Sequence, residues 1–241
     1  MSLWSSITHA VRRAWRAVKA VVRVVVRIVT AVVAVIFAAW DILFGFLGWP
    51  PKKLRYQVFI LSDNKGPLMD PSNPADAGEL RSAIDFFKMT FKDRFNVNVI
   101  AYGKPDVQVI EVTAPTAALD VSCGGAALSE EFGAAGEFFA DHLAGWNAIP
   151  INLGFPISIF IVRSMSGSSD GCSVGPLTDY VTMTPAAVRE LNVMAHESGH
   201  SCNLWHSGAH SNLMWPDPSR GNEVHWWQKN LVRISRHVRY L

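Results

Sequence analysis

Charged residues are scarce in this sequence, and acidic residues are almost absent from its first 55 positions. Asp, Glu, Lys and Arg make up 17% of the 241 residues, whereas hydrophobic residues make up 49%. A disordered, collagen-like or low-complexity chain would hold far fewer apolar residues, so these classes are excluded. Residues 1–55 contain one acid, Asp41, and carry a net charge of +8, while residues 56–241 carry −6. This division argues against a nucleic-acid partner for the acidic body and favours a membrane-facing N-terminus.

A stretch with almost no charge runs from Ile28 to Trp49, where Asp41 is the single charged residue among 22. A helix of 22 residues is about 33 Å long, close to the thickness of the hydrocarbon core of a bilayer. Upstream, five basic residues share one face of a helix: Arg12, Arg16, Lys19, Arg23 and Arg27. We therefore expect a basic amphipathic helix over residues 1–27, a transmembrane span over 28–49 and a linker over 50–55.

The charges on either side of the span predict its orientation. Six Lys and Arg precede it and three follow it, which favours a single-pass protein with a cytoplasmic N-terminus and with residues 56–241 outside the cytoplasm. Two other interpretations stay open: residues 1–49 lie on the membrane surface, or they are cleaved as a signal peptide. The apolar run is longer than the roughly 7–15 residues of a typical signal peptide. Neither the role of Asp41 nor the oligomeric state follows from the sequence.

Residues 56–241 alternate between strand-like and helical patterns, which predicts an α/β (or α+β) domain. Strands are expected at Tyr56–Leu61, Val97–Ile100, Val107–Val112, Pro156–Val162 and Tyr180–Met183. Helices are expected at Leu80–Phe95, at Ser129–Leu143 and from Asn222 to Leu241. Thr184 and Pro185 predict the start of a further helix, because Thr caps exposed N–H groups and Pro fits the first helical turn. A loop rich in Gly and Ser is expected over Ser166–Gly175.

The further helix carries the sequence His-Glu-Ser-Gly-His, residues 196–200. Residues four apart lie one above the other on a helix, so His196 and His200 can bind one zinc ion together. Glu197 is placed to reach a water activated by that metal without being a ligand itself. His206 follows six residues after His200, and Asn-Leu-Met-Trp-Pro follows at residues 212–216.

Together, residues 196–216 resemble the metzincin zinc endopeptidases, whose pattern is H-E-x-x-H-x-x-G-x-x-H followed by a turn that contains methionine. The Leu-Met-x-Pro sequence is most similar to that of the matrixins. The resemblance implies that His196, His200 and His206 bind one catalytic Zn²⁺. It also implies that Glu197 is the general base and that Met214 shapes the floor of the site. Outside residues 184–216 the resemblance is architectural, and it implies a twisted mixed sheet, an active-site helix and a C-terminal helix.

Asn203 departs from the family pattern, which usually has Gly at this position. The adamalysins of the thrombospondin-motif type also carry Asn there, and Asn tolerates the left-handed conformation better than other non-Gly residues. We therefore expect Asn203 to end the helix and to turn the chain so that His206 reaches the metal. The family's propeptide with a cysteine switch has no counterpart, because only Lys52–Arg55 separate the span from the first strand. Any latency must have another origin.

The resemblance also implies that an extended peptide substrate pairs with the edge of the sheet. Either Tyr180–Met183 or Pro156–Val162 is expected to form that edge. His210 is expected outside the site, because three ligands already leave one open position for catalysis. Three cysteines, Cys123, Cys172 and Cys202, allow three disulfide pairings with one thiol left over, or three reduced thiols.

The sequence thus predicts a membrane-anchored zinc endopeptidase that acts on a protein or peptide substrate and binds membrane lipid through residues 1–49. A rival hypothesis is a toxin-like or assembly protein, whose cationic N-terminal helix perturbs membranes while the protease domain is an effector or processing module. A catalytically inactive binding module is disfavoured, because all three histidines and Glu197 are present.

Overall fold

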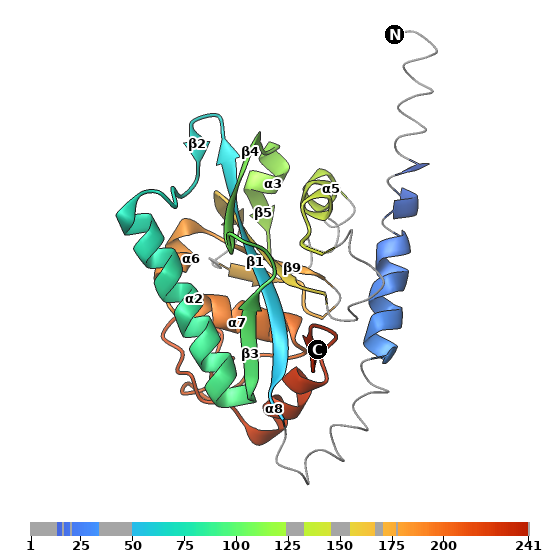
Figure 1. Ribbon diagram of the computed structural model, residues 1–241, viewed down its shortest axis with the longest axis vertical. Coiled ribbons are helices and arrows are strands. Elements are labelled where there is room, and N and C mark those ends of the chain that lie inside the picture. The colour runs from blue at the N-terminus through green and yellow to red at the C-terminus, as the bar shows by residue number, and fades with distance from the viewer. Residues whose placement is uncertain are drawn as a thin grey trace.

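A computed structural model describes residues 14–15, 17–19, 21–33, 50–123, 133–145, 155–166, 171–176 and 178–240. It has a twisted mixed sheet with helices on both faces, which confirms the α/β class (Figure 1). The main path of the sheet runs β10 (Val238–Arg239), β1 (Lys52–Asp63), β6 (Ile157–Ile161), β9 (Tyr180–Met183) and β8 (Gly171–Ser173). Three more strands pair with β1: β2 (Gly66–Pro67), β3 (Val97–Ala101) and β4 (Val107–Thr113). A second, two-stranded sheet joins β5 (Asp120–Ser122) to β7 (Ser164–Ser166).

Strand β1 is the centre of the fold and begins at Lys52, inside the segment expected as a linker. It pairs in parallel with β3 and β4 along one side and with β6 along the other. Its side chains alternate between two cores: Tyr56 and Val58 point into one, and Phe59 and Leu61 point into the other. A strand buried on both faces reads as a nearly continuous apolar run, which is why its sequence predicted a strand so clearly.

Helix α2 (Pro74–Phe95) covers one face of this sheet, and α3 (Thr116–Leu119) and α5 (Ala134–Asp141) cover the other. The side chain of Asn73 accepts a hydrogen bond from the N–H of Ala75 and so caps the start of α2. The helix buries Phe87, Phe91 and Phe95 along one stripe, as its spacing predicted. For α5, the expected start at residues 129–132 lies outside the described residues.

The helix expected after Thr184 is in fact two helices. Thr184 caps the short α6 (Pro185–Arg189), and a separate helix, α7 (Val193–Ser201), carries the His-Glu motif. The prediction of one continuous helix was wrong because the chain is extended at Glu190, with φ −86° and ψ 97°. Beside this break, the Asn192 side chain donates hydrogen bonds to the backbone oxygens of residues 218 and 220, so contacts distant in sequence hold it in place.

The expected C-terminal helix was too long. Helix α8 (Trp226–Arg233) has only eight residues, and β10 follows it and pairs antiparallel with β1. The periodic apolar residues continue past Arg233, but buried polar contacts fix the chain there: Arg236 donates to the backbone oxygens of Pro176 and Thr178, and His237 Nδ1 lies 2.8 Å from the backbone oxygen of Phe155. Tertiary contacts therefore override the helical pattern, and the final residue lies outside the described part of the chain.

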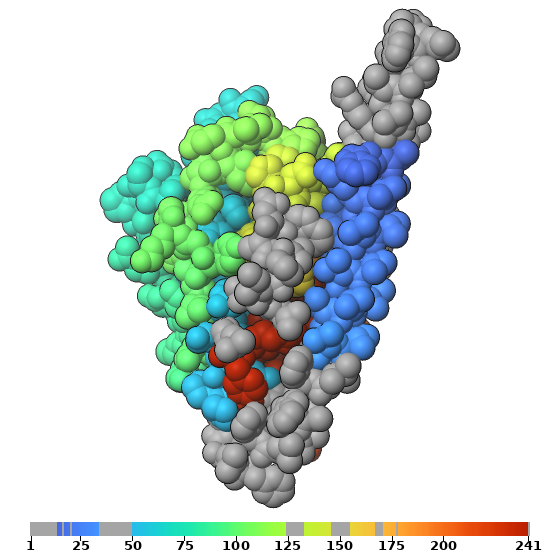
Figure 2. Space-filling model, turned by 45° about the vertical axis from the view of Figure 1, so that its right-hand side comes forward, coloured from blue at the N-terminus to red at the C-terminus, as the bar shows by residue number. Residues whose placement is uncertain are grey.

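The N-terminal segment is helical at residues 14–15, 17–19 and 21–33, and this helix lies along the flank of the body (Figures 1 and 2). Arg27 Nε donates to Asp179 Oδ2 over 2.8 Å, and Arg236 forms an ion pair with the same carboxylate. We call Arg27, Asp179 and Arg236 the Asp179 cluster; each side chain is at most 4% exposed. Among the described residues, no helix combines the length and the apolar character needed to cross a membrane. Of the expected span, residues 34–49 lie outside the described residues.

Candidate metal centre

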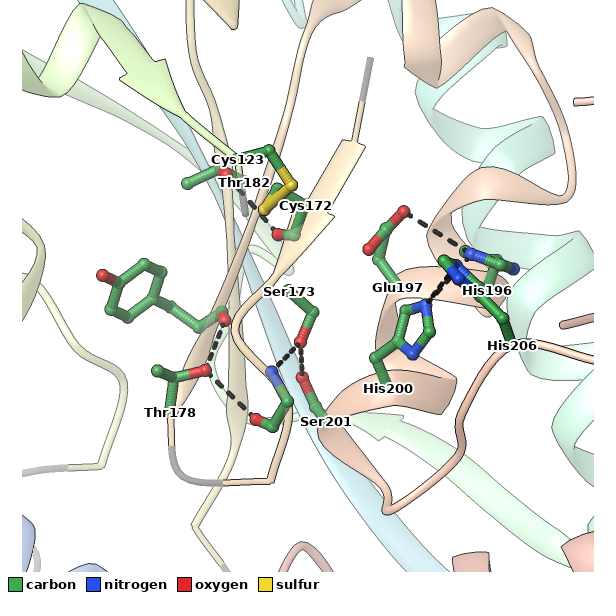
Figure 3. The surroundings of a disulfide bond; sticks show 12 residues. Cys123, Cys172, Ser173, Thr178, Thr182, His196, Glu197, His200, Ser201 and His206 are labelled. Carbon is green, nitrogen blue, oxygen red and sulfur yellow. Dashed lines mark hydrogen bonds and ion pairs between the residues drawn. A yellow bond between two sulfur atoms is a disulfide. The ribbon is translucent and has the colours of Figure 1, made fainter. Parts of the chain in front are cut away.

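Helix α7 presents His196 and His200 on one face. Their Nε2 atoms lie 3.1 Å apart, and the His206 Nε2 lies 3.2 Å from that of His200. The ligand atoms of all three residues lie within 4.8 Å of one another (Figure 3). A tetrahedral zinc site with Zn–N distances of about 2.0–2.1 Å has nitrogens about 3.3 Å apart. The three imidazoles therefore fit a metal ion of that size.

Asn203 brings the third histidine into this group. It has a φ of 72°, in the left-handed region, and directly follows Cys202, the residue that caps the C-terminus of α7. The N–H of Leu204 then donates back to the Gly199 carbonyl, so the helix stops and the chain reverses. The Asn203 side chain also donates to the backbone oxygen of Leu231, 3.0 Å away, which ties the turn to α8. Glycine could adopt this φ but could not make that hydrogen bond.

Backbone carbonyls orient two of the rings. The Nδ1 atoms of His196 and His200 each lie 2.8 Å from a carbonyl oxygen, that of Leu213 and that of Leu204 respectively. A protonated Nδ1 donates to the carbonyl, which leaves Nε2 with its lone pair facing the other rings. Burial lowers the pKa of His196 strongly and that of His200 to about 4, so both rings are neutral at pH 7. Neutral imidazole is the form that binds a metal.

Glu197 lies beside the three histidines but is not one of the residues grouped around the candidate metal position. Its Oε1 is 3.9 Å from the His196 Nε2, and the backbone N–H of Ser173 in β8 donates to its carboxylate. Burial raises the pKa of Glu197 to about 7, although Arg220 and the Ser173 amide favour the ionised form. The edge strand approaches closely here because residue 171 is glycine: a Cβ on Gly171 would lie 3.0 Å from Glu197 Cγ.

Met214 is fully buried and packs against α7 at Gly199. A Cβ on Gly199 would lie 2.8 Å from the Met214 sulfur, so glycine lets α7 pack on Met214 without displacing the end of its side chain. The Asn212 side chain accepts from the N–H of Met214 and also bonds to Gln228 of α8. The Met214 carbonyl accepts from the N–H of Ser207, one residue after the third histidine. The turn and the histidines are thus tied to each other.

Arg220 is a residue that the sequence analysis missed. Its buried guanidinium donates to the backbone oxygens of residues 215, 216 and 217 and so holds the loop after Met214. It is near enough to help lower the pKa of each of the three histidines, after the larger effect of burial. An arginine in a loop that follows two prolines is usually solvent-exposed, so the sequence carries no signal for this role.

His210 lies outside the group. Its Nε2 is 3.1 Å from the Ser219 hydroxyl, and its ring packs near Trp215. Of the three expected disulfide pairings, the structure has Cys123–Cys172 (Figure 3). Cys202 is a buried free thiol. Burial raises the pKa of Cys202 to about 12, so this thiol is inert at neutral pH.

Both expected edge strands are interior ones. Strand β6 pairs with β1 and β9, and β9 pairs with β6 and β8, so neither has an open side. Among the described strands the edge is β8, which lies within the segment expected to be a Gly/Ser loop. The prediction was wrong because three residues are too few for a period-two pattern, and Gly171 is present for close packing on α7.

Two solved structures are distantly similar to this chain. Metalloproteinase-II from Bacteroides fragilis matches with a TM-score of 0.46 and 14% identity, over 74% of this chain and 51% of that one. A chain from the structure of a chaperone–substrate complex matches with a TM-score of 0.43 and 12% identity, over 77% of this chain and 35% of that one. The chain thus spans about half of the first structure and about a third of the second. No protein family profile and no curated protein sequence matches it.

Proposed function

We propose that this protein is a zinc-dependent endopeptidase of the metzincin type. The observation that carries the proposal is the convergence of three imidazole Nε2 atoms beside the Glu197 carboxylate. Three neutral histidines that leave a fourth position open are the ligand set of a catalytic zinc site. The metzincin type is supported by the sequence of residues 196–216 and by the position of Met214 under α7.

In this proposal the metal, when bound, lowers the pKa of a water and polarises the carbonyl of the peptide bond. Glu197 accepts a proton from that water and later transfers it to the leaving amine. The Ser173 amide holds the Glu197 carboxylate in position for both transfers. The Leu213 and Leu204 carbonyls keep the rings of His196 and His200 turned towards the metal position.

A peptide substrate would bind along β8. Among the described strands, β8 pairs only with β9, so its other side can accept an extended peptide by strand addition. Ser173 of this strand contacts Glu197, and its hydroxyl lies 2.9 Å from that of Ser201 in α7. A peptide on this edge would therefore run beside the three histidines.

We also propose that residues 1–49 attach the protein to a membrane and that the catalytic domain lies outside the cytoplasm. The Arg27–Asp179 ion pair requires residue 27 to lie on the same side of the membrane as the body, so the cytoplasmic N-terminus expected from the sequence is not part of this proposal. The apolar run of residues 28–49 and the basic residues before it support the attachment. The Cys123–Cys172 disulfide supports an oxidising compartment for the body. The toxin-like or assembly alternative gains no support from the described part of the N-terminal helix, because Arg23 and Arg27 are buried against the body.

Zinc-dependent digestion of an unbiased peptide library tests the proposed activity. We expect cleavage of internal peptide bonds that a chelator stops and that added zinc restores, with one zinc per chain by metal analysis. A chain that binds zinc and cleaves no peptide in the library would contradict the proposal. The products would also give the cleavage preference.

A further inference from the structure

The described N-terminal helix turns basic and polar side chains towards the body and leaves apolar side chains exposed. A helix packed on a soluble protein usually does the opposite. Its buried side chains include Arg23, Arg27 and Thr30, each at most 8% exposed. Eight apolar side chains are each between 50% and 61% exposed: Trp15, Val18, Val21, Val22, Val25, Ile28, Val29 and Val32. Trp15, Val18 and Val22 also line a groove beside α5, and the other five lie on the outer side of the helix. At 3.6 residues per turn these eight cover an arc of roughly 140°.

Charge complementarity explains the inward face. The Asp179 carboxylate lies beneath the helix and pairs with both Arg27 and Arg236. Farther along, a groove of about 430 Å³ separates the helix from α5, and Arg23 and Asp141 both line it. The acidic body thus attracts the basic side of the helix, and the apolar side is left outside.

The outward face needs a partner, because soluble proteins rarely expose a continuous apolar surface of this extent. We infer that this face binds the interfacial region of a lipid bilayer, with the helix lying along the membrane and the body fixed to it through the Asp179 cluster. The inference rests on the membrane attachment proposed above and is independent of the peptidase activity.

The sequence beyond the helix favours lipid over a second copy of the chain. Residues 34–49 continue the apolar character with Asp41 as their single charged residue. That length of apolar chain matches the dimensions of a bilayer, and a helix–helix contact between two copies would not need it. Trp15 at the start of the exposed face, with Lys19 beside it, suits the boundary between lipid and water.

In this arrangement the apolar side of the helix meets the membrane, whereas the sequence alone suggested that the basic side does. A basic stripe that faces lipid head groups binds anionic vesicles far better than neutral ones and is released by salt. Arg23 and Arg27 instead face the body, so the apolar face should bind neutral phosphatidylcholine vesicles, with little dependence on salt.

A fluorescent label at Val25 tests which face meets the lipid. Val25→Cys in the full chain would carry an environment-sensitive fluorophore, and Val112→Cys is the matched control, because Val112 is 68% exposed on β4. The native cysteines do not compete, since two form a disulfide and Cys202 is fully buried. We expect the Val25 label to shift to the blue and to brighten several-fold with phosphatidylcholine vesicles, and nitroxide-labelled lipids should quench it. The Val112 label should not respond.

Each other outcome points to a different failure. If the chain sediments with vesicles but the Val25 label stays in water, another segment makes the attachment and the inference is wrong. If the chain does not sediment with vesicles at all, the proposed attachment fails together with the inference. A blue shift that grows with protein concentration before vesicles are added would instead identify a second copy as the partner. Circular dichroism and the urea midpoint show in every case whether the body is folded, whatever the outcome for the peptidase activity.

Discussion

Glu197 of the metal centre and Asp179 at the N-terminal helix are both buried carboxylates, but their surroundings move their pKa values in opposite directions. For Glu197, burial dominates and raises the pKa to about 7, with Arg220 and one backbone amide as weaker opposing influences. For Asp179, burial also favours the neutral form, but the guanidiniums of Arg236 and Arg27 outweigh it and lower the pKa.

Under the proposed function, the difference separates a reactive group, Glu197, from a structural one, Asp179. A carboxylate paired with two guanidiniums has its charge neutralised where it stands, and it contributes by holding two segments together. A buried carboxylate without an ion pair keeps the capacity to exchange a proton, which is the property that general-base catalysis needs. Equivalent substitutions in the two regions should therefore have different consequences.

Glu197→Gln should have the largest effect on activity. The amide keeps the size of the side chain but cannot accept a proton, so peptide cleavage should fall by roughly 10²–10⁴-fold. Zinc content and the urea midpoint should stay at the wild-type level, because no ion pair is lost. Glu190→Gln, on an exposed side chain, is the matched control. Near wild-type cleavage by the Glu197 variant would remove this residue from the mechanism.

His206→Ala should have the second-largest effect, which is on zinc binding. Removal of one of three imidazoles should weaken zinc binding by more than about 100-fold, the upper range for loss of an outer-shell partner. The fold should persist, since His206 is the exposed member of the group. Isothermal titration with zinc measures the change. Full zinc occupancy in this variant would show that another residue completes the site.

Asp179→Asn should reduce stability and leave the chemistry intact. With the carboxylate gone, two guanidiniums remain buried without their counter-ion, a loss of roughly 3–5 kcal/mol. The free energy of unfolding from urea titration gives the value, and zinc content should not change. Asp141→Asn, an exposed acid beside the same helix, should have almost no effect. A stability loss equal in both variants would mean that the Asp179 ion pairs are not responsible.

Acid should separate the N-terminal helix from the body. The pKa of Asp179 is lower in the folded protein than in the unfolded chain, so its contribution is complete above the ordinary carboxyl pKa of about 3.9. That contribution is lost as the pH falls from there through the lowered value. Hydrogen exchange at residues 21–33 should accelerate in this range. The Asp179→Asn variant should show fast exchange at every pH, and a pH step retained in that variant would refute the assignment.

Substitutions of Asn203 should have the smallest effects on stability and zinc binding. Asn203→Gly keeps the left-handed conformation and loses the hydrogen bond to Leu231, at a cost of about 0.5–1.5 kcal/mol. Asn203→Val should cost more and should weaken zinc binding, because a β-branched residue is strained at a φ of 72°. Equal zinc affinities in the two variants would contradict a role of this turn in placing His206.

The parts of the fold that local sequence determines were predictable. A period of four residues places His196 and His200 on one helix face, and the apolar run of β1 requires a buried strand. Asn203 was identified because few residues tolerate a left-handed conformation. Each of these depends on neighbours within one turn or one strand.

The remaining features depend on contacts distant in sequence. The break before α7 is held by the backbone of residues 218–220, and β8 is a strand only because β9 pairs with it. The helical spacing of Arg23 and Arg27 indicates that they share a face. It cannot indicate that Asp179, 152 residues beyond Arg27, turns this face towards the body.

The contact between Gly199 and Met214 restricts how this sequence can diverge over evolution. With the Met214 sulfur 2.8 Å from the place where a Cβ would stand, a side chain at position 199 requires the end of the Met214 side chain to shift or residue 214 to become smaller. The two positions should therefore change together among natural homologues: a chain with alanine at position 199 should carry a smaller residue at 214. If the two positions vary independently among homologous sequences, the Met214 side chain can move aside more easily than this packing suggests.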